Sequence, residues 1–265
     1  MAVYFDSSSD VAGAVSGQAT GWATTNFTVC GFARIETYLG SGIEQILFLA
    51  SIDGVTSSVG IEWAGSTDTN MYLFSNGSSQ AFGSRPAVGD PFFWYLQCSG
   101  TGAGQLTGGW CLLDGTAFVT ASMQLSSGAN GNTVSMAFGG SLSEWLAGQM
   151  AGCRLYDRVL TAAELEAERW SIYPAFFDVR CFWPMWDVAT HLIDFSGNGG
   201  TLDNFTGAGG SVPSDTAVSF PVRVKRGRAR VPAAGAGGGG GGPVPKLAAF
   251  GGKIMSSGGK LLRIA

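Results

Sequence analysis

A series of short apolar segments separated by glycine-containing turns limits what this chain can fold into. Residues 27–35 alternate in character with the period of two that is expected of a β-strand. The pairs Asp53-Gly54, Asn76-Gly77 and Asp114-Gly115 end later segments and are typical of hairpin turns. The expected strands are residues 2–5, 27–35, 45–52, 59–63, 71–74, 91–98, 109–113, 117–123 and 134–138, with a glycine-rich connection over 101–109. This spacing indicates an all-β sandwich of two antiparallel sheets rather than alternating strand and helix units.

The stretch from 149 to 170 changes from strand spacing to helix spacing. Residues 149–160 alternate, and a strict period of two places the even-numbered side chains on one face of a strand and the odd-numbered ones on the other. Thr161 and Glu164 form a capping box, which predicts the start of one short helix that ends near Trp170. The expected apolar anchors of this helix are Leu160 and Leu165, and the carboxylates expected on its solvated face are Glu164, Glu166 and Glu168.

Residues 154–165, reading Arg-hydrophobic-Tyr-x-Arg-x-Leu-Thr-x-x-Glu-Leu, resemble the closing strand and helix of laminin-G-like, concanavalin A-like jelly-roll domains. Weaker matches precede it in the family's order at 27–33, 48–54, 93–96, 112–115 and 134–140. Residues 194–199 resemble the Asp-x-Ser-Gly-Asn-Gly element that usually opens such a domain. Because this element follows the closing helix, we expect residues 172–220 to add strands from the C-terminal side, completing a jelly-roll domain over 1–220. A truncated second domain is the alternative, but about 45 residues are too few for an independent sandwich.

Charge divides the chain at about residue 220. Residues 1–220 contain 6 basic and all 19 acidic residues, so their net charge is 6 − 19 = −13. Residues 221–265 contain the other 15 − 6 = 9 basic residues and no acid. The unbroken glycine run 237–242 has no side chains to bury, so a basic, extended C-terminal arm is expected over 221–265. Such a charge asymmetry points to a partner for the arm, although a solvated tail is the alternative.

The arm contains the residues expected to dock onto that partner. Its apolar side chains occur in short groups between glycines, including the repeat Gly-Gly-Lys-aliphatic at 251–254 and 258–261. Short groups of this kind fit a chain that adds to the edge of a neighbouring sheet. The docking residues are expected to be Arg223, Lys225, Arg226, Arg228, Arg230, Ile254, Leu261, Leu262 and Ile264. The basic members would face an acidic surface on a shell protein or on another copy of this chain.

The cysteines and the N-terminus indicate where the protein is made. The five cysteines include no Cys-x-x-Cys pair, and an odd number suits buried, reduced thiols in a reducing compartment. Residues 1–10 show neither the basic nor the apolar region of a secretory signal peptide. No apolar run approaches the roughly 18 residues of a membrane span, so no membrane association is expected. We expect synthesis in a host cytoplasm.

The sequence lacks the usual constellations of catalysis. His191 is the one histidine, so no Ser-His-Asp set is available, and we interpret it as structural. The Glu-x-Asp-x-x-Glu pattern of polysaccharide-cleaving sandwiches is absent. The basic stretch has no interleaved aromatic residues, which makes nucleic acid an unlikely partner. We therefore expect no enzymatic activity.

No cofactor is expected, and calcium is the one metal for which candidate donors exist. The family often carries an acidic pair before the Arg-hydrophobic-Tyr triplet, but Ala151 and Gly152 occupy these places. The remaining loop carboxylates are oxygen donors of the kind that calcium prefers, although turn chemistry explains Asp53-Gly54 and Asp114-Gly115 without a metal. The loop donors are Asp53, Asp68, Asp114 and Asp194. Four tryptophans could stack on sugars, but their apolar surroundings favour core packing: Trp63, Trp94, Trp110 and Trp145.

Three functions remain. The fold is typical of proteins that work outside cells, yet the chain lacks a secretory signal. A virion protein, which is assembled in a host cytoplasm, reconciles the two observations. We therefore favour a bacteriophage virion structural protein: a head decoration, fibre or tail-associated component. It would act in the virion, with the jelly roll displayed and the arm anchored among other virion proteins, including further copies of itself. The alternative is a glycan-binding adhesin that recognises a host surface polysaccharide. A polysaccharide-degrading enzyme is a distant third.

Overall fold

The computed structural model describes residues 2–6, 12–14, 19–40, 43–52, 57–65, 68–100, 105–140, 146–185, 192–204, 214–216, 254–255 and 261–262. The chain separates into two units, Met1–Lys225 and Arg226–Ala265. In the second unit, the aliphatic pairs of the Gly-Gly-Lys repeat form β16 (Ile254–Met255) and β17 (Leu261–Leu262). These strands pair with each other in an antiparallel two-stranded sheet.

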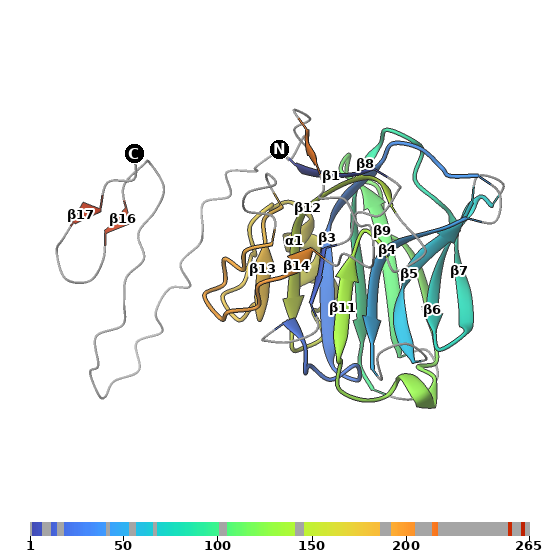
Figure 1. Ribbon diagram of the computed structural model, residues 1–265, viewed down its shortest axis with the longest axis horizontal. Coiled ribbons are helices and arrows are strands. Elements are labelled where there is room, and N and C mark those ends of the chain that lie inside the picture. The colour runs from blue at the N-terminus through green and yellow to red at the C-terminus, as the bar shows by residue number, and fades with distance from the viewer. Residues whose placement is uncertain are drawn as a thin grey trace. The chain divides into compact units, whose positions relative to one another are not determined.

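The first unit is an antiparallel jelly-roll sandwich of two sheets, as predicted (Figure 1). One sheet contains, in spatial order, β10 (Val119–Met123), β9 (Leu106–Leu112), β8 (Pro91–Cys98), β3 (Phe27–Ile35), β12 (Ala147–Tyr156), β1 (Ala2–Asp6) and β15 (Ser214–Thr216), with β13 (Cys181–Trp183) also paired to β12. The other contains β14 (Asp203–Asn204), β2 (Ala12–Ala14), β11 (Ser135–Phe138), β4 (Glu44–Ser51), β5 (Ser58–Ala64), β6 (Asn70–Ser75) and β7 (Ser78–Ser84).

Aromatic side chains fill the space between the two sheets. From alternate positions of β8, Phe92, Trp94 and Leu96 enter this core. The Phe48 ring of β4 stacks on Trp94 with the ring centroids 6.1 Å apart, so the two layers are in direct contact. Trp63 and Trp110 are buried as well, which confirms the prediction that the described tryptophans pack in the core.

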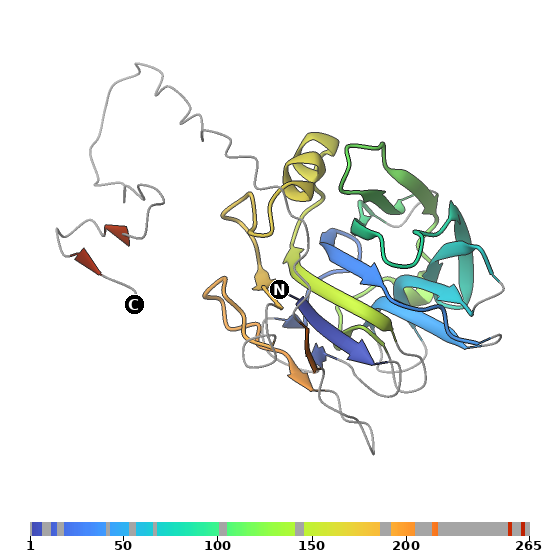
Figure 2. The same cartoon turned by 90° about the horizontal axis from the view of Figure 1, so that it is seen from above.

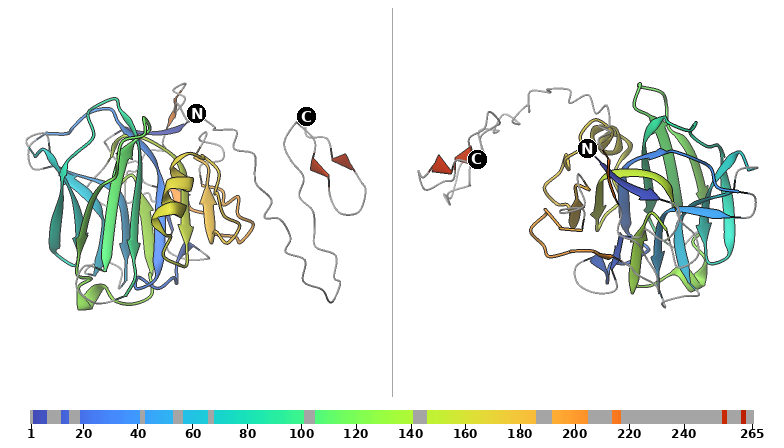
Figure 3. Two further views of the ribbon diagram at one scale, coloured as in Figure 1. Left: turned by 180° about the vertical axis from the view of Figure 1, so that it is seen from behind. Right: turned by 45° about the horizontal axis from the view of Figure 1, so that its top comes forward.

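The eight-stranded sheet is also covered on its outer face. Phe93 and Tyr95, the intervening residues of β8, belong to a second cluster that includes Leu160 and Leu165. Helix α1 (Ala162–Arg169) lies over this cluster, outside the sandwich (Figures 2 and 3). The predicted capping box is present: the Glu164 amide donates to the Thr161 hydroxyl at 3.3 Å, and the Thr161 amide donates to the Glu164 carboxylate at 2.8 Å. Within the described residues, α1 is the one α-helix, beside a 3₁₀ turn, η2 (Ser127–Ala129).

Residues after the helix add strands to both sheets. β13 pairs with β12, β15 pairs with β1, and β14 pairs with β2 in the other sheet. The strand-forming residues between 181 and 216 therefore belong to the same sandwich as residues 2–156. This pairing brings the connections around β13 next to the end of β12.

Two strand predictions were wrong. β7 was not expected, because its sequence Ser-Ser-Gln-Ala-Phe-Gly-Ser is polar; it is an edge strand, and of its residues only Phe82 is buried. β9 begins at Leu106, inside the predicted glycine-rich connection. Gly108 and Gly109 both lie in this strand. Glycine is needed at these positions because the Phe82 and Tyr95 rings occupy the space that a side chain would take.

The strict alternation predicted for 149–160 was also wrong. The pairing of β12 with β3 shifts register between Ala151 and Arg154, and Gly152 has a φ of +58°. This is a β-bulge, in which an extra residue with a left-handed backbone interrupts the ladder. The strand ends at Tyr156.

The bulge reverses which side chains share a face. Met150 packs between the two sheets with Cys153 and Leu155, although a strict period would separate them. Ala151 and Tyr156 pack on the outer face, under helix α1. A sequence pattern cannot reveal this change, because the period of two continues on each side of the bulge.

Replacing Gly152 by alanine should destabilise the sandwich more than the same change at Gly77. Both glycines have positive φ, +58° and +78°, which costs an alanine about 1–2 kcal/mol. A Cβ at Gly77 meets nothing within 4 Å, whereas a Cβ at Gly152 lies 2.9 Å from the Ile172 carbonyl oxygen. That contact should add about 1–3 kcal/mol. Urea unfolding of the two variants measures the difference, and equal losses would show that the bulge tolerates a side chain.

The five cysteines are buried and none is in a disulfide bond, which confirms the prediction of buried thiols. Burial raises the pKa of the Cys30, Cys111 and Cys181 thiols to about 12, so these groups stay protonated. Within the described residues, no helix combines the length and apolar composition needed to cross a membrane.

Candidate functional site

The residues predicted to dock the arm are mostly outside the described chain. Ile254, Leu261 and Leu262 lie in the β16–β17 sheet. Their side-chain contacts are not described, and their docking role stays a prediction. The others lie outside the described residues: Arg223, Lys225, Arg226, Arg228, Arg230 and Ile264.

The loop aspartates considered for calcium are used in turns. Asp53 lies outside the described residues, as do His191 and Trp145. Asp68, Asp114 and Asp194 each accept a hydrogen bond from the backbone amide two residues later, at 2.9, 2.9 and 2.8 Å. Across the described ranges, no three histidine, cysteine, aspartate or glutamate side chains gather where they could hold a metal ion.

A buried charged cluster connects β12, helix α1 and the chain that follows the helix. Arg154 and Glu168 form an ion pair in which neither side chain is exposed. Glu168 also accepts hydrogen bonds from the Tyr156 hydroxyl at 2.6 Å and the Ala175 amide at 2.8 Å. Arg154 donates to the carbonyls of Glu168 and Ser171 at 2.6 and 3.2 Å. The prediction that Glu168 lies on a solvated face was therefore wrong, because the bulge turns Arg154 toward the helix.

Aromatic rings surround the charged pair on the sheet side. The Arg154 guanidinium carbon lies 5.3 Å from the Phe32 ring centroid and 5.7 Å from that of Phe93, within range of a cation–π attraction. Burial, reinforced by the Glu168 carboxylate, raises the pKa of Tyr156, so its hydroxyl remains a donor. The cluster fixes the position of residues 171–175, which lead directly into the candidate site.

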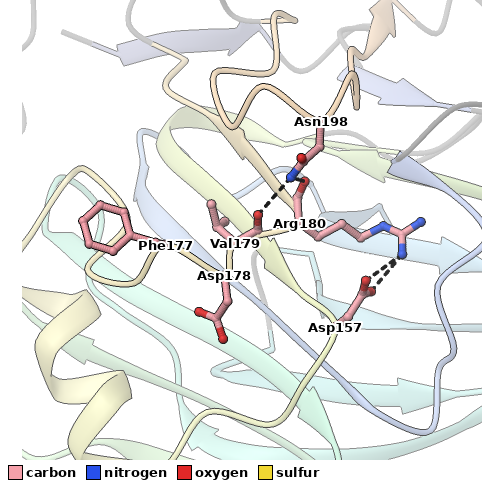
Figure 4. Close-up of a pocket in the computed structure, with 6 residues that line it drawn as sticks. All are labelled: Asp157, Phe177, Asp178, Val179, Arg180 and Asn198. Atoms are coloured by element: carbon pink, nitrogen blue, oxygen red, sulfur yellow. Dashed lines mark hydrogen bonds and ion pairs between the residues drawn. The ribbon is translucent and has the colours of Figure 1, made fainter. Parts of the chain in front are cut away.

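The candidate site is a surface pocket of about 430 Å³ beside this cluster. The pocket lies at the end of β12, where the chain before β13 and the chain after β13 both approach this strand end. Its lining residues are Asp157, Phe177, Asp178, Val179, Arg180 and Asn198. In Figure 4, the Phe177 ring and the Asp157–Arg180 pair lie on opposite sides of this group.

Ion pairs and amide hydrogen bonds order the polar part of the pocket. Arg180 Nη1 donates to both Asp157 oxygens, at 3.0 and 2.7 Å, and Nη2 donates to the Thr20 carbonyl at 2.8 Å. The Asn198 side-chain amide donates to the carbonyls of Val179 and Arg180 at 3.2 and 2.9 Å. These contacts connect residues 179–180 to Asp157 and Asn198, as Figure 4 shows, and also to Thr20.

Asp178 and Phe177 form the exposed part of the pocket. The Asp178 carboxylate pairs with Arg158, which also binds Glu164 at 2.9 Å and holds the pKa of that carboxyl at about 2. The side chains of Asp157 and Asp178 are each 53% exposed. Phe177 is 98% exposed, although its neighbour Phe176 packs against the cluster under helix α1. A ring this exposed contributes little to the core and is accessible to a ligand.

The local sequence accounts for the position of Asn198. Asp194 accepts hydrogen bonds from the amides of Phe182 and Gly200 at 2.9 and 2.8 Å, as well as from Ser196. Burial disfavours the Asp194 carboxylate, but these backbone donors outweigh burial and lower its pKa. The Asp-x-Ser-Gly-Asn-Gly element is therefore a carboxylate-centred turn, and it directs Asn198 to the pocket.

The sequence did not identify the pocket. Its residues come from 157, 177–180 and 198. Pairing of β13 with β12 brings the first two groups together, and the turn around Asp194 adds Asn198. One sequence feature that included a pocket residue was the Asp-x-Ser-Gly-Asn-Gly element at 194–199, which contains Asn198. Phe177 follows another phenylalanine, and nothing in the sequence tells which of the two is exposed.

The two antiparallel sheets define a jelly-roll-type sandwich, and comparison with known proteins agrees at the level of fold. No protein-family model and no curated protein matches the sequence. A putative carbohydrate-binding protein from Bacteroides ovatus has a TM-score of 0.52 at 12% identity; the alignment covers 77% of this chain and 58% of that one. A SAP-like pentraxin from Limulus polyphemus gives 0.44 at 13%, covering 62% and 79% of the two chains. Tailspike protein 2 from a bacteriophage of Escherichia coli O157:H7 gives 0.47 at 10%, covering 69% and 30%.

Proposed function

We propose that the sandwich is a saccharide-binding module whose binding site is the pocket beside β13. The observation that carries this proposal is the 98% exposed Phe177 ring in a pocket that Asp157, Asp178 and Asn198 also line. A sugar ring presents an apolar C–H face and a rim of hydroxyl groups. An aromatic face with a few fixed polar groups beside it matches both features. The shared fold of the putative carbohydrate-binding protein from Bacteroides ovatus supports the proposal.

The proposal is binding without hydrolysis. Glycoside hydrolysis requires two carboxyl groups, one of which gives a proton to the leaving group. Asp157 and Asp178 are the carboxylates of the pocket, and each is paired with an arginine, Arg180 or Arg158. This arrangement suits acceptance of hydrogen bonds from a ligand.

Replacing Phe177 by alanine should weaken saccharide binding at least tenfold and leave the fold intact. The loss of a stacked aromatic face corresponds to about 1.4 kcal/mol of binding free energy. Because the ring is almost fully exposed, the free energy of unfolding should change by less than about 0.5 kcal/mol. Binding of the full-length protein to a glycan array identifies ligands, and calorimetry on the best ligand compares the variants.

The matched control is Val88→Ala, which removes an exposed apolar side chain in the connection before β8, away from the pocket residues. It should leave binding unchanged. An array without any bound glycan, or equal affinity of the Phe177→Ala variant and the unmodified protein, would contradict the proposed function.

A second candidate function is a structural role in an assembled particle. The net charge of −13 over residues 1–220 and of +9 over residues 221–265 favours an assembled particle, in which basic arms meet acidic bodies. We propose a laminin-G-like, concanavalin A-like virion component of a bacteriophage, with residues 221–265 as its attachment to other virion proteins or further copies. The strand and capped helix at 154–165 support the family proposal.

A further inference from the structure

The pocket contains a basic side chain, Arg180, that is already paired with a protein carboxylate. The Arg180 side chain is 19% exposed and donates to Asp157 and to the Thr20 carbonyl. Arg158, at the edge of the site, donates to Asp178 and Glu164, and its guanidinium carbon lies 5.6 Å from the Phe176 ring centroid. A ligand carboxylate or sulfate would have to compete with these protein carboxylates for a cationic partner.

The amide in the pocket is also oriented as an acceptor. Both protein contacts of the Asn198 side chain are made by its nitrogen, which donates to the carbonyls of Val179 and Arg180. An amide nitrogen has two donors, so its capacity is satisfied and its carbonyl oxygen remains for a ligand. The exposed polar groups of the pocket are therefore acceptors: the Asn198 oxygen and the half-exposed carboxylates of Asp157 and Asp178.

Resting on the proposed function, we infer that this pocket takes uncharged or amine-bearing saccharides and discriminates against anionic ones. Hydroxyl and ammonium groups donate hydrogen bonds to carboxylates, whereas a uronate, sialate or sulfate group contributes acceptors only. An anionic group would also enter a region where three carboxylates outnumber two guanidinium groups, so the local net charge of 2 − 3 = −1 repels it. The carboxylates are those of Asp157, Asp178 and Glu164, and the guanidinium groups are those of Arg158 and Arg180. The Phe177 ring recognises the apolar face of a sugar, and the acceptors of the pocket favour ligands without a negative charge.

The test uses array glycans in matched pairs that differ by one acidic group, such as glucose and glucuronate oligomers, or lactosamine with and without a terminal sialate. The neutral member should bind the full-length protein at least tenfold more tightly. The difference should shrink in 1 M salt, where the Debye length falls to about 3 Å. The Asp178→Asn variant should lower the ratio of the affinity for the neutral glycan to that for the acidic glycan at least threefold, because it removes one carboxylate and frees Arg158 from its pairing with Asp178. Asp90→Asn, at an exposed aspartate outside the pocket, should not.

The outcomes separate this inference from the proposed function. If acidic members bind as tightly as neutral ones and Phe177→Ala abolishes both, saccharide binding stands and the charge selection is overturned. If no glycan binds, the proposed function fails and the selection fails with it. A preference for neutral glycans that Asp178→Asn leaves unchanged would also overturn the inference, because the discrimination would then arise outside the pocket carboxylates.

Discussion

Replacing Glu168 by alanine should lower the free energy of unfolding by about 3–5 kcal/mol, because it leaves the buried Arg154 guanidinium without its counter-ion. Both side chains of the pair are fully buried. The substitution also removes the acceptor for the Tyr156 hydroxyl and for the Ala175 amide. An unpaired charge in this environment is one of the few causes of such a large loss from a single substitution.

Urea unfolding followed by tryptophan fluorescence measures this loss. Glu166→Ala is the matched control on the same helix, since Glu166 is 48% exposed and pairs with Arg169 at 3.2 Å. It should cost clearly less than Glu168→Ala, because Arg169, whose side chain is 3% exposed, keeps its hydrogen bond to the Leu112 carbonyl at 2.8 Å. Glu168→Gln separates charge from hydrogen bonding, because an amide oxygen can still accept from Tyr156 and Ala175. A loss below about 1 kcal/mol for Glu168→Ala would show that Arg154 finds compensation elsewhere.

The same substitution should weaken saccharide binding, although Glu168 does not line the pocket. Arg154 and Glu168 hold the Ser171 carbonyl and the Ala175 amide, and residues 177–180 follow directly. Loss of these contacts frees the connection that presents Phe177. The buried pair therefore connects the strand pairing of β12 to the geometry of the site.

Sequence patterns predicted the elements whose signals are local. In β3 and β8 the alternation of residues between two buried faces follows from the strand period, and the Thr161–Glu164 capping box needs only residues three apart. Both were confirmed. The fold class followed from these elements, because short antiparallel strands that bury two faces require two covering layers.

The features that sequence patterns missed depend on tertiary contacts. The bulge at Gly152 changes the phase of β12, and that change buries Arg154 under the helix and recruits Glu168 as its partner. The pocket depends on the short strand β13, which carries three residues and pairs with the part of β12 that follows the bulge. A glycine in an apolar segment is compatible with many conformations, so neither the bulge nor the site that depends on it could be predicted.

Deleting residues 243–265 should leave the sandwich folded and reduce incorporation into phage particles at least tenfold. Among the described residues, both sheets of the sandwich are made within 2–216, and β16 and β17 pair with each other. The free energy of unfolding should therefore change by less than about 0.5 kcal/mol. The deleted residues follow the glycine run and contain both Gly-Gly-Lys-aliphatic repeats. Quantitative mass spectrometry of purified particles measures copies per particle.

Two variants distinguish the parts of the arm. A glycine-serine segment of equal length in place of 243–265 keeps the reach of the arm but removes its aliphatic groups, and it should fail like the deletion. Replacing the basic residues of 221–230 by glutamine keeps the aliphatic groups and should lower the number of copies per particle. The attachment that remains should depend less on salt than that of the unmodified protein, because fewer charges are left to screen. Full occupancy by the truncated protein would place the attachment within residues 1–242, on the sandwich or on the five basic residues that the deletion leaves at 221–230.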